Sequence, residues 1–335
     1  MFINRFCFVV WMIALGIECT AHTFGVGIVD GEGKVLVNCK DSVSTVSGGL
    51  IPNDVAKHHF DVKEKVLSDA LVKVNFSFKD VGLIVYSQGP GFSPCLKVGA
   101  NFAKQLAKEH SLPVIGVNHC VAHLTIGQLL CKIKNCVFLY VSGVNTQVIA
   151  LAGERFRIFG ETLDTGLGNA LDKFGRDAGL GFPAGPKIEQ IAKAGKFLEL
   201  PYSVKGMDVA FSGIVSRALK QLKQGEKIED VCFSLQETCF AMMAEICERA
   251  LAHTEENELL LVGGVAANKR LSEMLSVMCF ERGAKFAVVP LEFAGDQAVM
   301  IAWQGLLEYC AGRRVDLDSV DFNPYWRVDE VDVIW

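Results

Sequence analysis

The chain alternates short, continuously apolar runs with longer segments in which apolar residues recur every three or four positions. This pattern predicts buried strands that alternate with amphipathic helices, which is typical of a mixed α/β fold. The tail over residues 313–335 is predicted to be irregular, because it contains Pro324 and alternating valine and aspartate. Helices are predicted over residues 55–74, 96–110, 169–180, 186–194, 211–224, 228–254 and 297–310.

Two stretches of the chain resemble each other. Residues 13–33 and residues 137–154 each predict an apolar strand, a small polar turn, a second apolar strand and a Gly-Glu turn that leads to a third strand. In each half a later strand enters a glycine-rich turn before a helix, at residues 83–91 and at residues 259–268. The repetition predicts a duplicated fold of two lobes with a site in the cleft between them.

The length of 335 residues agrees with two lobes. We expect the first lobe at residues 12–135 and the second at residues 136–312, with the helix over residues 297–310 able to pack back on the first lobe. Residues 2–14 are apolar and resemble a short signal segment, but no convincing cleavage site follows and the run is too short to span a bilayer. We treat residues 1–11 as an extension of unassigned status, since Met12 would itself make a natural start.

Composition narrows the class of protein. The net charge of −5 is not typical of a nucleic-acid binder, and the basic clusters at residues 187–205 and 217–227 fit solvated helix faces. The 12 cysteines form no C-x-x-C pair, and several fall in apolar helical runs. They predict reduced, mostly buried thiols and a reducing, cytoplasmic compartment, with no membrane partner.

The most specific chemical signal is the pair His119 and His123. The spacing of four residues places both imidazoles on one face of a helix, where they can hold one divalent metal. Asn118 is a good N-cap, and the apolar residues 113–117 predict a strand just before it. A bare pair of this kind also fits two histidines with separate packing or capping roles. Asp296, before the last helix, is either an N-cap or the oxygen donor that completes a two-histidine, one-carboxylate metal set.

Several turns could bind a phosphate or a nucleoside. The turn within residues 140–147 fits a phosphate or acyl-phosphate, and Gly263 and Gly264 allow a nucleotide to approach closely. Asn268 can cap a helix or meet a ribose. Asp172 can accept from sugar hydroxyls, or pair on a helix surface with Lys173 or Arg176. Glu189 can bind a ligand, or it can interact favourably with the dipole of the helix in whose first turn it lies.

Taken in order, these motifs resemble the universal tRNA threonylcarbamoyltransferase family, in its archaeal and eukaryotic branch, whose members are catalytic subunits of the KEOPS complex. The resemblance extends from about residue 13 to about residue 312. Its motifs lie at residues 15–23, 87–91, 117–123, 140–143, 160–164, 168–174, 185–189, 208–213, 262–268 and 295–296.

The resemblance implies the actin/hexokinase/Hsp70-like (ASKHA) fold and transfer of threonylcarbamoyl from threonylcarbamoyl-AMP to N6 of the adenosine 3′ to the anticodon in ANN-decoding tRNAs. It implies one divalent ion, iron or zinc, and either threonylcarbamoyl-AMP or ATP as the nucleotide. The partners implied are tRNA and KEOPS-type subunits: a small atypical protein kinase, a dimerising subunit and a kinase-binding regulator. The location implied is the cytoplasm, and also the nucleus in a eukaryote. The resemblance implies that the metal ligands are His119, His123, Tyr140 and Asp296. It implies that the phosphate and acyl part are bound by Tyr140, Val141, Ser142, Gly143 and Val144. It implies that the nucleoside is bound by Asp172, Gly185, Glu189 and Asn268.

Departures from the family pattern leave alternatives open. Val144 stands where the family has a second glycine, and would be strained if the position requires a positive φ. Ala184 replaces another glycine, and Gln297 an asparagine. The base that accepts the amine proton is not evident, and Glu18 is a candidate because the repeat places it at the cleft. The alternative functions are a non-catalytic scaffold in a KEOPS-type assembly and another ASKHA enzyme that uses ATP or carbamoyl phosphate.

Overall fold

The computed structural model describes residues 12–43 and 50–335, and the extension over residues 1–11 lies outside them. The chain divides into two compact units. The first combines the described residues up to Leu129 with Asp296–Trp335, and the second is Leu130–Gly295. The second unit is therefore an insertion in the sequence of the first.

A five-stranded mixed sheet forms the centre of the first unit, in the order β3-β2-β1-β4-β5. Its first three strands form an antiparallel meander, whereas β4 and β5 run parallel to β1. Every residue of β1, β2 and β5 is buried, which explains why these strands are apolar in sequence except at their ends, at Glu18, Thr23 and Asn118. The strands are β1 (Ala14–Glu18), β2 (Thr23–Val29), β3 (Val35–Ser42), β4 (Leu83–Gly89) and β5 (Val114–Asn118).

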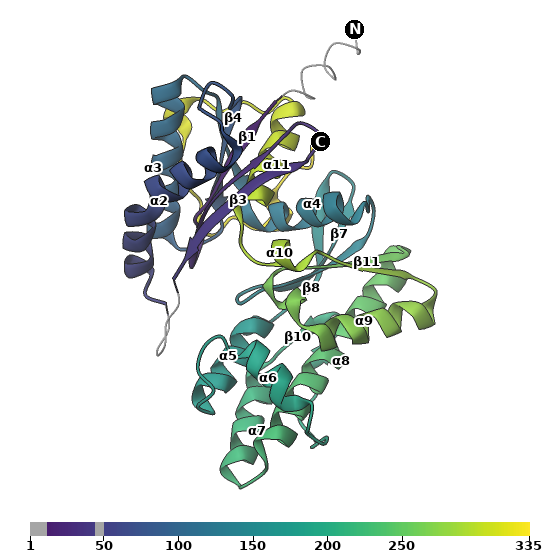
Figure 1. Ribbon diagram of the computed structural model, residues 1–335. Helices are drawn as coiled ribbons and strands as arrows, with labels where there is room; N and C mark the ends of the chain where they lie inside the picture. The colour runs from purple at the N-terminus through teal and green to yellow at the C-terminus, as the bar shows by residue number, and fades with distance from the viewer. Residues whose placement is uncertain (1–11, 44–49) are drawn as a thin grey trace. The chain divides into compact units, whose positions relative to one another are not determined.

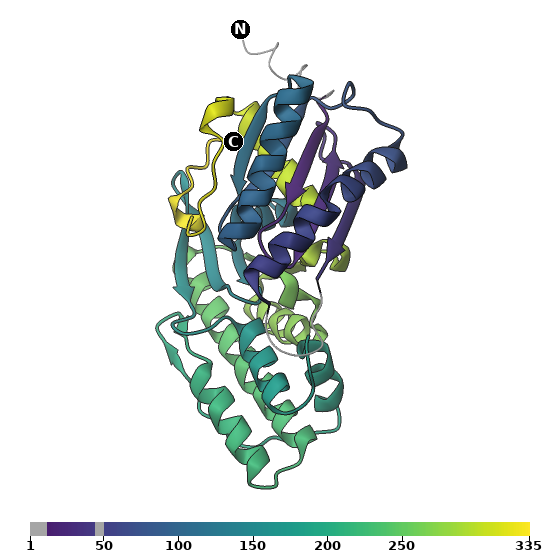
Figure 2. The same ribbon diagram turned by 90° about the vertical axis from the view of Figure 1, so that its left-hand side faces the viewer.

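Helices cover both faces of this sheet (Figure 1). The helices α2 (Pro52–Val74) and α3 (Ser93–His110) lie across one face, as Figure 2 shows, and pack on the core that includes Leu15 and Ile17. The helix α11 (Ala298–Cys310) packs on β1, β2 and β4. Gly16 permits this contact, because a Cβ there would lie 2.3 Å from the carbonyl oxygen of Ala298. The helix α4 (His119–Cys131) follows β5 directly.

The second unit repeats the same sheet order. Its strands run β12-β11-β6-β7-β8, with an antiparallel meander from β6 to β8 and with β11 and β12 parallel to β6. The order corresponds strand for strand to that of the first unit, which is the signature of a duplicated architecture. The strands are β6 (Val137–Val141), β7 (Thr146–Ala152), β8 (Arg155–Glu161), β11 (Glu258–Val262) and β12 (Lys285–Val288), and a separate hairpin is formed by β9 (Val204–Lys205) and β10 (Asp208–Val209).

The helices of the second unit gather around α8, which packs on β6, β7 and β11 and also contacts α6, α7 and α9 (Figure 1). In the described part of the chain, none of the helices is long and apolar enough to cross a membrane. The helices of the second unit are α5 (Leu167–Asp177), α6 (Gly185–Ala192), α7 (Ser212–Lys223), α8 (Ile228–Thr254), α9 (Lys269–Arg282) and α10 (Leu291–Ala294), with the 3-10 turn η1 (Gly264–Ala267).

The second unit ends at Gly295, whereas the sequence analysis ended the second lobe at residue 312 and allowed the helix over residues 297–310 to pack back on the first lobe. The physical reason is that α11 buries its apolar side on β1 and β2 and so packs with the first unit. The tail after α11 also stays with the first unit, and its short helices are η2 (Leu317–Ser319) and η3 (Val328–Glu330). The cysteines in the described ranges are all free thiols and mostly buried, as predicted.

Candidate functional site

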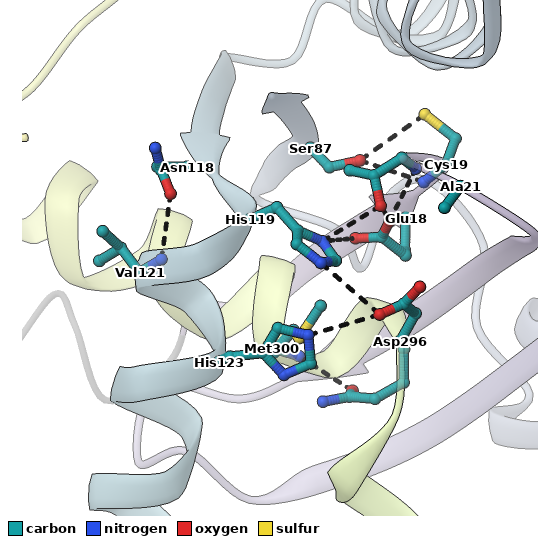
Figure 3. Close-up of polar contacts among 12 residues, drawn as sticks. Glu18, Cys19, Ala21, Ser87, Asn118, His119, Val121, His123, Asp296 and Met300 are labelled. Carbon is teal, nitrogen blue, oxygen red and sulfur yellow. Dashed lines mark hydrogen bonds and ion pairs between the residues drawn. The ribbon is translucent and has the colours of Figure 1, made fainter. Parts of the chain in front are cut away.

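The two histidines lie at the start of α4, as their spacing predicts (Figure 3). Asn118, the last residue of β5, caps the helix, because its Oδ1 accepts from the amide of Val121 at 3.1 Å. His119 and His123 are buried, and their ring centroids are 4.8 Å apart. A strand that ends in a capped helix thus fixes the two imidazoles next to each other.

Asp296 completes the group from a segment distant in sequence. Its Oδ1 lies 3.5 Å from Nε2 of His119 and 3.4 Å from Nε2 of His123. Ligand atoms of the three residues all lie within 4.8 Å of one another (Figure 3). Two imidazole nitrogens and one carboxylate oxygen at this spacing fit a single divalent transition metal.

Gln297 explains why Asp296 is available to the histidines. The amide of Met300 donates to Oε1 of Gln297 at 3.0 Å, so Gln297 is the N-cap of α11. The alternative in which Asp296 caps this helix is therefore wrong. With the cap supplied by its neighbour, the carboxylate of Asp296 is left to face the imidazoles.

Glu18 contacts His119 at Nδ1, the ring nitrogen that does not face Asp296. The carboxylate is fully buried at the end of β1, and its Oε2 lies 3.0 Å from Nδ1 of His119. Its Oε1 accepts from the amide and the hydroxyl of Thr20 at 2.7 and 2.5 Å. A carboxylate that holds Nδ1–H orients Nε2 toward a metal, an arrangement common in histidine metal sites.

Charge coupling shapes the protonation of this group. Burial works to lower the pKa of His119, but the adjacent Glu18 and then Asp296 raise it to about 9. Burial lowers the pKa of His123. Burial works to raise the pKa of Asp296, but the hydrogen bond from His123 and the charge of His119 hold it well below its usual range. A divalent ion at Nε2 of His119 would therefore displace a proton.

Three neighbours of the triad were given no role by the sequence analysis, although two of them, Thr20 and His22, lie in its motif over residues 15–23. The hydroxyl of Thr20 lies 3.3 Å from Nδ1 of His119. Nδ1 of His22 lies 3.8 Å from Oδ2 of Asp296, and Nζ of Lys40 donates to the carbonyl of Asp296 at 3.5 Å. Thr20 and His22 belong to the turn between β1 and β2, and only its polarity could have indicated a role.

In the second unit, the turn between β6 and β7 presents the residues expected to meet a phosphate. The amide of Ser142 donates to the carbonyl of Asn145, and the amide of Asn145 donates to Oγ of Ser142, at 2.8 and 3.0 Å. The carbonyls of Ser142 and Gly143 accept from the amides of Gly168 and Asn169 at the start of α5. The turn is thus a rigid structure tied to a helix N-terminus.

Val144 fits this turn without backbone strain. The side chain is 67% exposed, and Val144 is not among the described residues with a positive φ. The strain that the family comparison raised is therefore absent. The glycine that the turn requires is Gly166, where a Cβ would lie 2.3 Å from the carbonyl oxygen of Val144.

Asp172 is held chiefly by backbone amides, and the charge of Arg176 makes a smaller contribution. Its Oδ1 accepts from the amide of Ala184 at 2.7 Å, and the amide of Gly185 adds a second hydrogen bond. Burial raises the pKa of Asp172, and these amides oppose the shift. Asp172 and Gly185 are therefore brought together between α5 and α6.

Glu189 and Asn268 meet at the start of α9. Oε1 of Glu189 accepts from the amide of Lys269 at 3.0 Å. Oδ1 of Asn268 caps α9 by accepting from the amide of Leu271 at 3.0 Å, and its Nδ2 lies 3.4 Å from Oε1 of Gln236. The capping role of Asn268 is confirmed, and any ribose contact would use the rest of the side chain.

Two features lie at the carboxyl ends of neighbouring strands β6 and β11. Tyr140 is buried on β6, in the second unit, whereas the metal triad lies in the first. Gly263 follows β11 with a φ of 94°, and a Cβ there would lie 2.4 Å from the carbonyl oxygen of Val141. The glycine thus allows the turn before η1 to approach β6 closely.

Similar solved structures share the fold at low sequence identity. HypF of Thermococcus kodakarensis matches with a TM-score of 0.61 at 16% identity, over 89% of this chain and 48% of that one. The (R)-2-hydroxyglutaryl-CoA dehydratase component A of Acidaminococcus fermentans matches with a TM-score of 0.56 at 12% identity, over 90% of this chain and 99% of that one. The fold is the ASKHA fold, as the duplicated sheets and the motifs indicated.

Sequence relatives are much closer. A tRNA N6-adenosine threonylcarbamoyltransferase of Thermococcus sibiricus is 50% identical over 97% of this chain and 100% of its own length. A probable bifunctional tRNA threonylcarbamoyladenosine biosynthesis protein of Methanobrevibacter smithii is 48% identical over 97% of this chain and 60% of its own length. The model of the family described as tRNA N6-adenosine threonylcarbamoyltransferase matches residues 34–303. The chain therefore belongs to the tRNA N6-adenosine threonylcarbamoyltransferase family.

Proposed function

We propose that this chain transfers threonylcarbamoyl from threonylcarbamoyl-AMP to N6 of the adenosine 3′ to the anticodon in ANN-decoding tRNAs. The observation that carries the proposal is the compact group of His119, His123 and Asp296 in a member of this family. These residues would hold one divalent ion, either iron or zinc. When bound, the ion would supply Lewis-acid polarisation of the carbamoyl carbonyl and a partner for the threonyl carboxylate.

The second unit would hold the adenylate. Tyr140 is the proposed further ligand of the ion. In the turn after it, the amides of Ser142 and Asn145 are used within the turn, which leaves those of Gly143 and Val144 to face the phosphate and acyl group beside Val141. Amide donors fixed by a rigid turn can stabilise the charge that develops as AMP leaves.

The nucleoside would be held by the two pairs described above. Asp172 and Gly185 form one pair between α5 and α6, and Glu189 and Asn268 form the other at the start of α9. Backbone amides donate to the carboxylates of Asp172 and Glu189 and so fix their positions. The acceptor sites that remain on these two carboxylates suit ribose hydroxyls. ATP is the alternative nucleotide for the same residues.

We assign Glu18 to positioning His119, in place of the proton-accepting role expected from the sequence. The carboxylate is fully buried, and both oxygens are engaged by Thr20 and His119. To accept the amine proton, Glu18 would have to give up these partners. Its contacts support a role in holding the imidazole of His119 in the orientation that binds a metal.

The partners we propose are tRNA and KEOPS-type subunits: a small atypical protein kinase, a dimerising subunit and a kinase-binding regulator. The net charge of −5 supports this, because a chain of this charge benefits from partners that supply part of the basic surface for tRNA. We place the assembly in the cytoplasm, and also in the nucleus in a eukaryote.

The test is nucleoside mass spectrometry of unmodified ANN-decoding tRNA, incubated with this chain, its partners and an enzymatic source of threonylcarbamoyl-AMP. Threonylcarbamoyladenosine should form, and His119→Ala should abolish it. His110→Ala is the matched control, because His110 is an exposed histidine at the end of α3, stacked on Phe78. Absence of product from folded, metal-loaded protein with its partners would favour the scaffold function instead.

A further inference from the structure

The tail after α11, residues 311–335, is hydrogen-bonded to β4 and to the loop that follows β4. The hydroxyl of Tyr86 on β4 donates to the carbonyl of Asp321 at 2.7 Å, and the amide of Asn323 donates to the carbonyl of Gln88 at 2.8 Å. The amide of Gly91 donates to the carbonyl of Pro324 at 3.2 Å. The tail is irregular in secondary structure but fixed in position along β4.

From this position the tail reaches the N-cap of the histidine-bearing helix. Nδ2 of Asn118 donates to the carbonyl of Trp326 at 3.1 Å and lies 3.4 Å from the carbonyl of Arg327. The other end of the same amide, Oδ1, caps α4 through Val121. Asn118 is fully buried, so these hydrogen bonds are not exchanged with water. A single side chain therefore links the tail to the residue immediately before His119.

A second connection joins the tail to α4 two residues beyond His123. The hydroxyl of Thr125 donates to Oε1 of Gln304 at 2.8 Å, and Nε2 of Gln304 donates to Oε1 of Glu308 at 2.7 Å. Glu308 pairs with Arg313, whose guanidinium lies 5.9 Å from the centroid of the Trp326 ring. Thr125, Gln304 and Glu308 are all buried. The two connections meet at Trp326 and enclose the segment that carries both histidines.

We propose that this closed set of contacts, which we term the tail clamp (Asn118, Thr125, Gln304, Glu308, Arg313 and Trp326), positions α4 for metal binding. The inference rests on the proposed function only in taking His119, His123 and Asp296 as metal ligands. None of the clamp residues is among the three proposed ligands, so they would act through α4 as positioning residues. Outer-shell contacts that orient ligands typically change metal affinity by about 10- to 100-fold when they are removed.

The clamp can be tested by Co²⁺ titration of metal-stripped full-length protein, followed by the visible absorption of the bound ion. Asn118→Asp keeps the oxygen that caps α4 but replaces the amide that donates to Trp326 with an acceptor. Arg313→Ala cuts the second connection at the ion pair with Glu308. Each should raise the Co²⁺ dissociation constant about 10-fold or more and alter the spectrum. Arg314→Ala is the matched control, because this exposed neighbour stacks on Tyr309 and meets the clamp only at the backbone carbonyl of Arg313, which no clamp side chain uses.

Milder variants keep the test decisive if one of these proteins fails to fold. Arg313→Lys retains a cation for Glu308 and should recover much of the affinity lost in Arg313→Ala. Tyr86→Phe removes only one tether of the tail and should weaken Co²⁺ binding by a few-fold. Unchanged affinity and spectrum in folded Asn118→Asp and Arg313→Ala, or in Tyr86→Phe together with whichever of the two folds, with binding by the parent protein still lost in His119→Ala, would overturn the clamp alone. Absence of Co²⁺ binding in the parent protein would overturn the proposed metal site and the clamp together.

Discussion

At the scale of single residues, Val144 shows that a departure from a family pattern need not damage a turn. The backbone there has no positive φ, and the side chain is 67% exposed. We expect Val144→Gly to keep or raise transferase activity while lowering the free energy of unfolding by about 0.5–1 kcal/mol, because glycine increases the freedom of the unfolded chain. Urea unfolding and tRNA modification assays measure the two effects. Val144→Ala is the control for the lost side chain, and a large loss of activity in the glycine variant would show that the turn depends on valine.

His59 gives a pH dependence that arises chiefly from burial of its own ring. The ring is fully buried, its Nε2 lies 2.8 Å from the carbonyl of Ala21, and burial, only partly opposed by that carbonyl, lowers its pKa to about 4. In the unfolded chain the pKa is about 6.5, so between pH 6.5 and 4 the unfolded state binds more protons. Stability should therefore fall as pH falls through this window, by up to about 3 kcal/mol.

Urea unfolding at several pH values between 7 and 4.5 tests this contribution. His59→Gln keeps a donor for the carbonyl of Ala21 but cannot titrate, so its stability should depend less steeply on pH, by up to about 1.4 kcal/mol per pH unit. Equal slopes for the variant and the parent protein would contradict the assignment of His59 as a buried neutral imidazole.

At the scale of elements, the N-cap of α11 links helix stability to the metal group. Gln297 is fully buried and accepts from the amide of Met300, while the preceding Asp296 faces the histidines. Gln297→Ala should lower the free energy of unfolding by about 1 kcal/mol, because one amide of the first turn loses its acceptor. Gln297→Asn restores the residue usual in the family and a favoured cap, and should leave stability unchanged or higher. Thermal unfolding compares the two, and equal losses in both would show that length, not capping, matters at this position.

The sequence predicts elements well where local signals agree. The predicted and observed bounds of α8 coincide, because Glu229 and Asp230 mark its first turn and Glu255 ends it in a left-handed conformation. The extent of α9 was not predicted. Val277 and Phe280 are exposed on α9, at 51% and 85%, and these outward apolar residues blur the periodicity that marks a buried face.

At the scale of the whole molecule, what could be predicted depends on distance along the chain. The pair His119 and His123 and its cap Asn118 are local, so spacing alone placed them on one helix face. Their contacts with Glu18 and with the carbonyl of Trp326 join residues 101 and 208 positions apart. Backbone acceptors leave no trace in a pattern of side chains, so the tail was predicted to be irregular without any indication of what it holds.

The insertion of the second unit leads to a prediction for the whole chain. Residues 130–295 leave the first unit in the last turn of the helix that carries the histidines and return at Asp296. A divalent ion bound by the triad would therefore join the two points at which the first unit is interrupted, and it would bind only the folded state. Zn²⁺ at about 100 times its dissociation constant should raise the free energy of unfolding by about 2.7 kcal/mol, or roughly 4 °C in Tm for a chain of this length.

Scanning calorimetry with Zn²⁺ and with a chelator measures this gain, and hydrogen exchange should locate the added protection at α4 and the start of α11. Asp296→Asn should lose most of the gain, because an amide is a much weaker ligand than a carboxylate. Asp316→Asn is the control, since that aspartate is exposed and its side chain makes no capping hydrogen bond to η2. The ion would not connect α4 to the segment where the chain re-enters the first unit if Tm did not change with Zn²⁺. The same conclusion would follow if Zn²⁺ raised the Tm of Asp296→Asn as much as that of the parent protein.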